Sequence, residues 1–336
     1  MSLAAHVATL GRGPGRSRSL TLAEAGEAMG AILAGRAAPE AVGAFLMLLR
    51  MKGETAAEIA GMSLAAHQSM PALPTVDLDW PSYAAGRSRG LPWFLLAARL
   101  VALAGFRVLV HGWNGRDEPV RSHLAAAGIP RVDRLSGLQR AFSEVGVAYL
   151  PLEVLSPPLY RLIGLRETLG LRSAVHTVCR MLNPARARTS VQGVFHPGYR
   201  PLQLDAACLM GWRALAIIKG GGGEFERHPA KPVRIFGLRE GRRFEKTLPS
   251  LRDGHNRLAE GPAEGLDLAA LWHGVRRDSF AEAVVLGTAA LALDALGVPD
   301  PQDEAARLWR TRHRLLPGLP ASGGCRAGTS DERIMP

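Results

Sequence analysis

The feature that most constrains this chain is a change of hydrophobic periodicity near residue 75. Before it, apolar residues recur at helical spacing; after it, short apolar segments alternate with helical ones. Strands that alternate with helices predict a largely parallel sheet with helices on both faces. The chain has 336 residues, of which 47% are hydrophobic, enough for one large or two modest domains. We therefore expect a small helical bundle followed by a larger α/β domain.

The first seventy residues carry helix start and stop signals. Thr21 and Glu24 have capping-box spacing, in which each side chain bonds the other residue's backbone amide and starts a helix. This helix is expected to reach Ala34. Pro39 is suited to begin a second helix, and a third is expected after Thr55.

Beyond the proline-rich link at 71–74, the pattern predicts strands at the following segments: Val76–Asp79, Phe106–Val110, Ala148–Leu150, Val191–Val194, Ala214–Ile218 and Val233–Phe236. A loop is expected from Pro81 to Gly90. Helices are expected at Leu91–Leu103, Val120–Ala127, Phe280–Leu296 and Asp303–Leu315. The tail Ala321–Pro336 contains Gly and Ser and is expected to be disordered.

The cysteine count and the apolar segments bear on location. Three cysteines without a CxxC pair fit a reducing compartment better than a disulfide scaffold. The N-terminus lacks the pattern of a signal peptide. The apolar stretch Trp93–Val110 is interrupted by Arg99 and Arg107 and is too short to span a bilayer. We expect a cytoplasmic protein that does not enter membranes.

Several motifs occur in an order found in a known family: Leu20–Gly35, Val42–Gly61, Ala104–Gly112, Leu124–Ile129, Arg166–Ser173 (RETLGLRS) and Leu182–Ala185 (LNPA). Together they resemble anthranilate phosphoribosyltransferases and pyrimidine nucleoside phosphorylases of glycosyl transferase family 3. The resemblance implies a discontinuous helical domain, residues 1–70 with 155–183 packing on it. It implies an α/β domain from residues 75–154 and 184–320, and a homodimer formed through the helical domain.

The chemistry of that family depends on motifs that this sequence alters. A glycine loop, GTGGD, approaches phosphoribosyl pyrophosphate there; here residues 80–90 read WPSYAAGRSRG, and Tyr83 stands where bare backbone is needed. The family's HGNR becomes HGWN at His111–Asn114. Its magnesium-binding Asp-Glu pair is replaced by the run KGGGGEFER, in which Glu224 and Glu226 are weak metal candidates.

These alterations resemble the YbiB-type branch of the family, which implies a retained fold, a lost phosphoribosyl pyrophosphate motif and nucleic-acid binding. We therefore expect no catalytic residues, no cofactor and no anthranilate phosphoribosyltransferase activity. The alternative is a phosphoribosyl or glycosyl transferase with an altered donor or acceptor, which would need magnesium. Arg166 lies where the family contacts the carboxylate of its acceptor, so its retention fits an acceptor site, a structural role or a new phosphate contact.

The distribution of charge gives a separate argument for nucleic acid. The net charge is +11, and all but four of the 41 basic residues are arginine. Residues 87–140, 161–188 and 227–257, with Arg12, Arg16 and Arg18, hold 27 basic but seven acidic residues. Such stretches predict a basic face that binds DNA or RNA without sequence preference. The candidate contacts are Tyr83, Arg87, Arg89, Trp113, Asn114, Arg116, Arg166, Arg172, Lys219 and Arg227.

Overall fold

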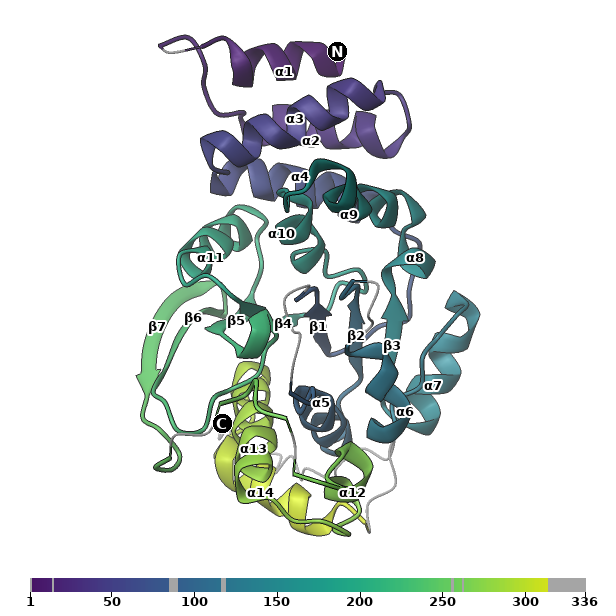
Figure 1. Ribbon diagram of the computed structural model, residues 1–336, viewed down its shortest axis with the longest axis vertical. Coiled ribbons are helices and arrows are strands. Elements are labelled where there is room, and N and C mark those ends of the chain that lie inside the picture. Colours follow the sequence, from purple (N-terminus) through teal and green to yellow (C-terminus); the bar gives the residue numbers. More distant parts are fainter. Residues whose placement is uncertain are drawn as a thin grey trace, which may run out of the picture.

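A computed structural model describes residues 2–13, 15–84, 90–115, 119–254, 257–261 and 263–313. It has a helical part at the N-terminal end and a larger part built on one sheet (Figure 1). This architecture confirms the predicted fold class of a helical bundle followed by an α/β domain. The expected tail at 321–336 lies outside the described residues.

The helical part begins with four helices: α1 (Leu3–Gly11), α2 (Leu22–Leu33), α3 (Pro39–Lys52) and α4 (Ala56–Gln68). Capping boxes start α2 and α4, with Thr21 paired to Glu24 and Thr55 paired to Glu58. Glu58 is fully buried, and its carboxylate also accepts bonds from the Leu20 amide (2.8 Å) and Lys52 Nζ (3.0 Å). One carboxylate therefore joins α2, α3 and α4. The short helix α1 was not expected from the sequence.

Helices α2 and α4 pack closely because Gly61 has no side chain. A Cβ atom at this position would lie 2.1 Å from the carbonyl oxygen of Leu22. The contact is the most extensive between helices of the bundle.

The middle of the chain returns to this bundle. After α8 (Leu152–Leu155), the helices α9 (Pro157–Leu169) and α10 (Val175–Arg180) lie beside the bundle, and α10 contacts α4 (Figure 1). Helix α11 (Tyr199–Leu209) also contacts α4. The two parts of the molecule therefore meet along α4, α10 and α11.

The described residues form one sheet of seven strands, in the order β3-β2-β1-β4-β5-β6-β7. The strands are β1 (Leu78–Ser82), β2 (Val108–Gly112), β3 (Val147–Pro151), β4 (Thr189–Val194), β5 (Ala214–Lys219), β6 (Val233–Arg239) and β7 (Arg242–Leu248). The first five are parallel; β6 and β7 are antiparallel additions at one edge.

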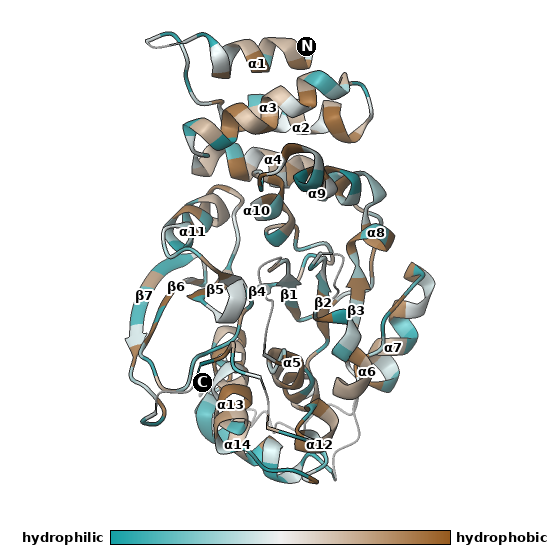
Figure 2. Cartoon of the chain, in the orientation of Figure 1, coloured by the Kyte–Doolittle hydropathy of each residue, from teal (hydrophilic) through white to brown (hydrophobic). Residues whose placement is uncertain are grey.

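The remaining elements cover the sheet or connect its strands. They are α5 (Phe94–Leu103), η1 (Arg121–His123), α6 (Leu124–Ala127), η2 (Leu135–Gly137), α7 (Leu138–Glu144), η3 (Gly221–Gly223), α12 (Leu268–Trp272), α13 (Ser279–Leu296) and α14 (Pro301–Thr311). By length and composition, α13 is apolar enough to cross a membrane. It packs against α5, α14, β4 and β5, so its apolar residues form the core under the sheet (Figure 2).

Two strands differ from the sequence prediction. β1 extends through Pro81 and Ser82, which were expected to begin a loop. Proline is accommodated because β1 pairs with β4 at Leu78 and Asp79 alone, so one side of Pro81 needs no amide bond. β7 was not expected, because its charged sequence lacks an apolar run.

Candidate anion-binding cleft

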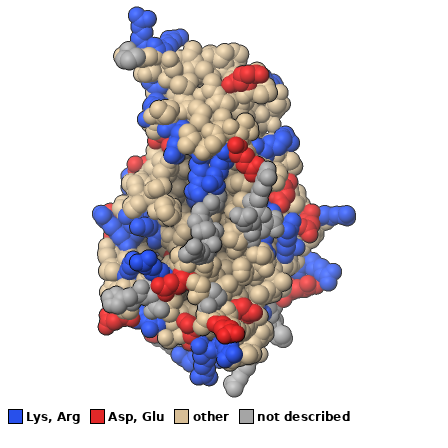
Figure 3. Space-filling model, in the orientation of Figure 1, with Lys and Arg blue, Asp and Glu red and all other residues tan. Residues whose placement is uncertain are grey.

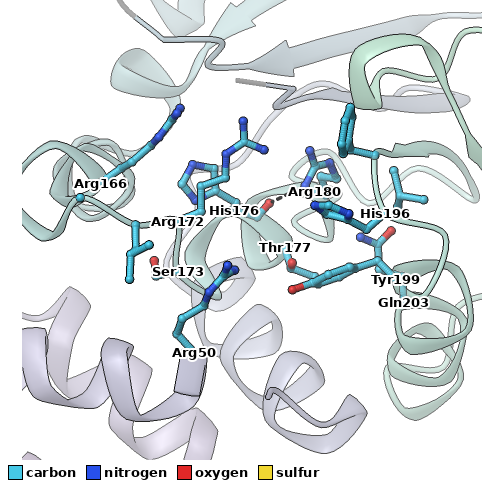
Figure 4. A pocket seen from close by; sticks show the side chains of 14 residues that line it. Arg50, Arg166, Arg172, Ser173, His176, Thr177, Arg180, His196, Tyr199 and Gln203 are labelled. Carbon is cyan, nitrogen blue, oxygen red and sulfur yellow. Dashed lines mark hydrogen bonds between the residues drawn. The ribbon is translucent and has the colours of Figure 1, made fainter. Parts of the chain in front are cut away.

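A cleft of about 350 Å³ lies where the helical part meets the α/β part (Figure 4). It is lined by residues from α3, α9, α10, α11 and the segment after β4: Arg50, Arg166, Gly170, Leu171, Arg172, Ser173, His176, Thr177, Arg180, Val194, Phe195, His196, Tyr199 and Gln203. Four of these are arginines, and none is acidic. Figure 3 shows basic side chains gathered at this junction.

Local structure brings the arginines together. Helix α9 begins at the Ser156 cap and ends at Gly170, whose φ of +67° reverses the chain. The reversal places Arg166, near the end of α9, and Arg172, just beyond it, on the same cavity. Arg50 comes from the last turn of α3, and Arg180 ends α10. The RETLGLRS motif is thus a helix end that presents two guanidinium groups.

Two of the cleft arginines carry charge that no side chain of the described residues neutralises. Within the described residues, Arg50 and Arg172 have neither a hydrogen bond nor an ion pair. Burial lowers the pKa of Arg172, and the charges of Arg166, Arg180 and Arg50 lower it further. Like charges held this close favour an anion between them.

Two neutral polar side chains complete the cleft. The ring nitrogens of His176 and the amide atoms of Gln203 are buried without a hydrogen-bond partner in the described structure. Burial and the charges of Arg180, Arg172 and Arg166 lower the pKa of His176 to about 3, so its imidazole is neutral near pH 7. Buried polar groups normally have partners, so these side chains are an exception, and a rotation of either would bring its polar atoms to a ligand in the cleft.

Arg180 links the cleft to the strand ends. It is buried, and its guanidinium donates to the carbonyl oxygens of Tyr83 (3.1 Å) and His176 (3.4 Å). Arg180 therefore joins the segment after β1 to the cleft wall.

A buried carboxylate lies at the carboxyl ends of β1 and β2. Oε1 of Glu224 accepts bonds from Ser82 Oγ (3.0 Å), the Ala84 amide (3.1 Å) and Asn114 Nδ2 (2.9 Å). An amide, a hydroxyl and a carboxamide converging on one anion form the kind of cradle that holds phosphate oxygens. Here the protein supplies the anion itself.

The weak metal candidates face different partners. Glu224 takes the bonds described above, whereas Oε2 of Glu226 accepts from the Phe94 amide (3.0 Å) at the start of α5. Within the described part of the chain, no group of three or more His, Cys, Asp or Glu side chains could hold a metal ion. These hydrogen bonds of the two glutamates thus go to different segments, Glu224 to the ends of β1 and β2 and Glu226 to the start of α5.

The structure assembles the predicted site residues only in part. Arg166 and Arg172 line the cleft, whereas Arg87, Arg89 and Arg116 lie outside the described residues. Lys219 is exposed at the end of β5, and Asn114 is buried against Glu224.

Three predicted contacts are corrected. Tyr83 is fully buried and Trp113 is 7% exposed, so neither ring can stack on a base. Arg227 is buried under the sheet and lines a different cavity. The sequence prediction failed here because residues next to a predicted loop were assumed to lie at the protein surface.

The predicted basic face is also smaller than the arginine count suggested. Many of these arginines form ion pairs: Arg18–Glu24, Arg121–Glu153, Arg131–Asp133, Arg140–Glu144, Arg188–Glu240, Arg234–Glu245, Arg239–Asp294 and Arg243–Asp205. Counting charge by segment missed partners that are distant in sequence. It also missed Arg50, which lies outside the counted stretches, and the neutral residues His176 and Gln203.

Comparisons of the sequence with known proteins all point to one family. Residues 7–70 match the model of the glycosyl transferase family helical bundle domain. An anthranilate phosphoribosyltransferase from Moorella thermoacetica is 31% identical over 301 residues, 86% of this chain and 88% of the relative. One from Chloroflexus aurantiacus is 29% identical over 296 residues, 83% of this chain and 85% of the relative.

Solved structures show the same fold. Anthranilate phosphoribosyltransferase from Thermus thermophilus has a TM-score of 0.76 at 22% identity, covering 92% of this chain and 94% of that one. The Saccharomyces cerevisiae enzyme in complex with PRPP and Mg has a TM-score of 0.71 at 16% identity, covering 93% of each chain.

Proposed function

Because the chain belongs to the anthranilate phosphoribosyltransferase family of glycosyl transferases, we propose that it is a transferase of this family with an altered donor or acceptor. The acceptor is an anionic small molecule bound in the arginine-lined cleft. The observation that carries this proposal is the convergence of four guanidinium groups on a cavity without an acidic lining residue.

The cleft's polarity supports an anionic acceptor that also has a hydrogen-bonding group. Arg50 and Arg172 offer charge that is not used within the described protein, and Gln203 offers a donor and an acceptor. A carboxylate or phosphate would be bound by the arginines, while a neutral polar edge of the same molecule pairs with Gln203 or His176.

The altered donor is supported by the strand ends. The backbone amide of Ala84 and the side chains of Ser82 and Asn114 already bond Glu224. A donor pyrophosphate placed there would meet this carboxylate, and like charges repel. We therefore propose that the phosphoribosyl pyrophosphate motif is lost in its usual form. A transferase that still uses a donor with phosphates would need magnesium to hold those phosphates next to the Glu224 carboxylate.

Calorimetric titration tests the acceptor proposal. Benzoate, anthranilate and inorganic phosphate are titrated into the wild type, Arg172→Gln and a control, Arg140→Gln, whose side chain is exposed and paired with Glu144. We expect binding of at least one anion to weaken about tenfold or more in Arg172→Gln and to be unchanged in the control. The proposal fails if none of these anions binds.

A separate assay tests turnover. Each anion that binds is incubated with phosphoribosyl pyrophosphate and magnesium, and release of pyrophosphate is measured. Release that depends on the acceptor establishes the transferase. Anion binding without release for any pentosyl donor restricts the protein to binding.

A second candidate function is sequence-independent binding of DNA or RNA, as the resemblance to the YbiB-type branch implies. It is favoured by the unpaired Arg50 and Arg172 at the mouth of an open cleft. Arg50→Glu with Arg172→Glu should weaken binding of a labelled oligonucleotide, and wild-type affinity should fall steeply with salt. If the oligonucleotide does not bind at low salt, this function is excluded. Dimerisation through residues 1–70 and a cytoplasmic location stay predictions.

A further inference from the structure

A second cavity, of about 400 Å³, lies where β4 and β5 begin, at the opposite edge of the parallel strands from Glu224. It is lined by α4 of the helical part and by the two segments that lead into β4 and β5. It shares no lining residue with the arginine-lined cleft. The proposed transferase reaction therefore leaves this cavity without a role.

The charge of this cavity is positive. Within the described residues it is lined by three arginines, Arg186, Arg188 and Arg213, and by no acidic side chain. Nη2 of Arg188 (2.5 Å) and Nη2 of Arg213 (2.7 Å) both bond the carboxylate of Glu240. The exposed Arg186 has no hydrogen bond or ion pair from its side chain within the described residues. One carboxylate shared by two of three arginines leaves an excess of positive charge, which favours an anionic ligand.

A tight turn fixes the backbone of Arg186. Oδ1 of Asn183 accepts from the Ala187 amide (2.8 Å), and Nδ2 of Asn183 donates to the Ala187 carbonyl oxygen (2.8 Å). The φ angle of Arg186 is +56°, in the left-handed region that is unfavourable for a residue with a side chain. Strained backbone is concentrated at functional sites, so this turn points to a role for the Arg186 side chain.

Two uncharged side chains offer polar groups that are open to solvent. Nε1 of Trp212 and the ring nitrogens of His67 have no hydrogen-bond partner within the described residues, and they are not sealed from solvent as the ring nitrogens of His176 are. Burial and the charge of Arg186 lower the pKa of His67, so its imidazole is neutral near pH 7. The indole N–H is a donor only, which also selects a ligand with an acceptor group.

The remaining wall of the cavity is apolar. Leu182 is buried, and Met210 and Trp212 are partly buried against the same core. Leu64, from α4, is half-buried. Apolar surface that faces a cavity gains from contact with an apolar ligand, which an inorganic anion does not provide.

We propose that this cavity binds an organic carboxylate with an apolar body. Arg186 binds the carboxylate, the indole N–H of Trp212 is a further donor, and the apolar body packs against Leu64, Leu182 and Met210. Leu64 belongs to the helical part and Trp212 to the α/β part, so a bound ligand contacts both parts of the molecule.

Titration calorimetry with four matched probes tests this chemistry. Hexanoate has both the charge and the apolar body. Hexanol lacks the charge, hexylamine carries the opposite charge and acetate lacks the body. We expect hexanoate to bind at least about tenfold more tightly than each of the other three, because each of them loses one class of contact. No binding of hexanoate, or equal binding of any of the other probes, overturns the proposal.

Variants of the lining residues test the location. Arg186→Gly removes the guanidinium and suits the left-handed backbone, so it should fold and weaken hexanoate binding about tenfold or more. Trp212→Phe keeps an aromatic ring without the donor and should weaken binding about threefold. The control is Asp300→Gly, the same backbone change at a residue with φ of +46° that lines a different cavity. Unchanged hexanoate affinity in Arg186→Gly overturns the proposal.

Arg172→Gln separates this cavity from the arginine-lined cleft. It should leave the affinity for hexanoate unchanged, because Arg172 lines the cleft and not this cavity. Weaker binding in Arg172→Gln, together with unchanged binding in Arg186→Gly, would place the carboxylate in the cleft and overturn the proposal. The proposed function depends on the cleft alone, so it stands if the hexanoate tests fail.

Discussion

The hydroxyl oxygen of Tyr83 lies 2.8 Å from Nδ1 of His111, and both side chains are completely buried. Nε2 of His111 lies 3.0 Å from Oδ1 of Asp79, whose Oδ2 accepts from Ser190 Oγ (2.7 Å). Burial raises the pKa of Tyr83, so the phenol keeps its proton and donates to the imidazole. A chain of polar groups thus connects β1, β2 and β4 below the cleft.

Removing the Tyr83 hydroxyl should destabilise the fold. Tyr83→Phe leaves a buried imidazole nitrogen without its donor, at a cost of about 1–3 kcal/mol in the free energy of unfolding. Urea unfolding measures the change. Tyr160→Phe is the matched control, because that ring is 41% exposed. Equal stability of the wild type and Tyr83→Phe would show that the bond contributes nothing.

The cleft arginines should reduce stability while they support binding. Arg172→Gln relieves repulsion from Arg166, Arg180 and Arg50, so unfolding should become less favourable, by no more than about 0.5 kcal/mol because solvent screens this partly exposed guanidinium. Thermal unfolding without added anion measures this effect. Adding phosphate should raise the melting temperature of the wild type more than that of the variant. A variant that is less stable than wild type would mean that Arg172 is a structural residue.

His176 should make the protein less stable in acid. Its pKa is about 3 in the folded chain and near 6.5 when unfolded, so between these values the unfolded state binds the extra proton. Stability should therefore fall as pH decreases from about 6.5 toward 3, with a contribution of up to about 1.4 kcal/mol per pH unit. His176→Gln should show a shallower slope in urea unfolding at several pH values. Identical slopes would contradict a neutral buried imidazole.

Two glycines in the bundle should respond oppositely to alanine. Gly61→Ala forces a Cβ atom against the carbonyl of Leu22 and should cost about 3 kcal/mol. Gly30→Ala, in α2, meets no atom within 4 Å and should stabilise the helix by about 0.5–1 kcal/mol. Urea unfolding of both variants makes the comparison. A small effect of Gly61→Ala would mean that α2 and α4 can separate without loss of stability.

Sequence patterns predicted most of the fold, because local chemistry determines it. The Thr21 capping box can be recognised from residue spacing, and β2 and β4 can be recognised from their apolar composition. β7 was missed because it lies at the sheet edge, where charged residues are tolerated and no apolar pattern is required. The end of β1 was misplaced because the sequence does not show that this end of the strand pairs with β2 and not with β4.

The cleft was less predictable, because it is made by contacts between distant segments. Arg166 and Arg172 were identified through a motif, but Arg50 and Arg180 come from helices whose meeting depends on the return of the chain to the bundle. Conversely, Arg188, which lies in one of the predicted basic stretches, is paired with Glu240. The net charge of a sequence segment therefore cannot show which of its arginines line a cleft and which are held in ion pairs.

The position of β7 has a consequence for the behaviour of the molecule at high concentration. Its outer side carries backbone groups with no further strand in the described sheet, which is the geometry that recruits another chain. Arg242, Arg243, Glu245 and Lys246 lie along that strand, and most of its residues are hydrophilic (Figure 2). Charged residues on an edge strand disfavour pairing with the edge of another chain. The charged sequence that hid β7 from the sequence prediction therefore also makes its free edge a poor template for a further strand.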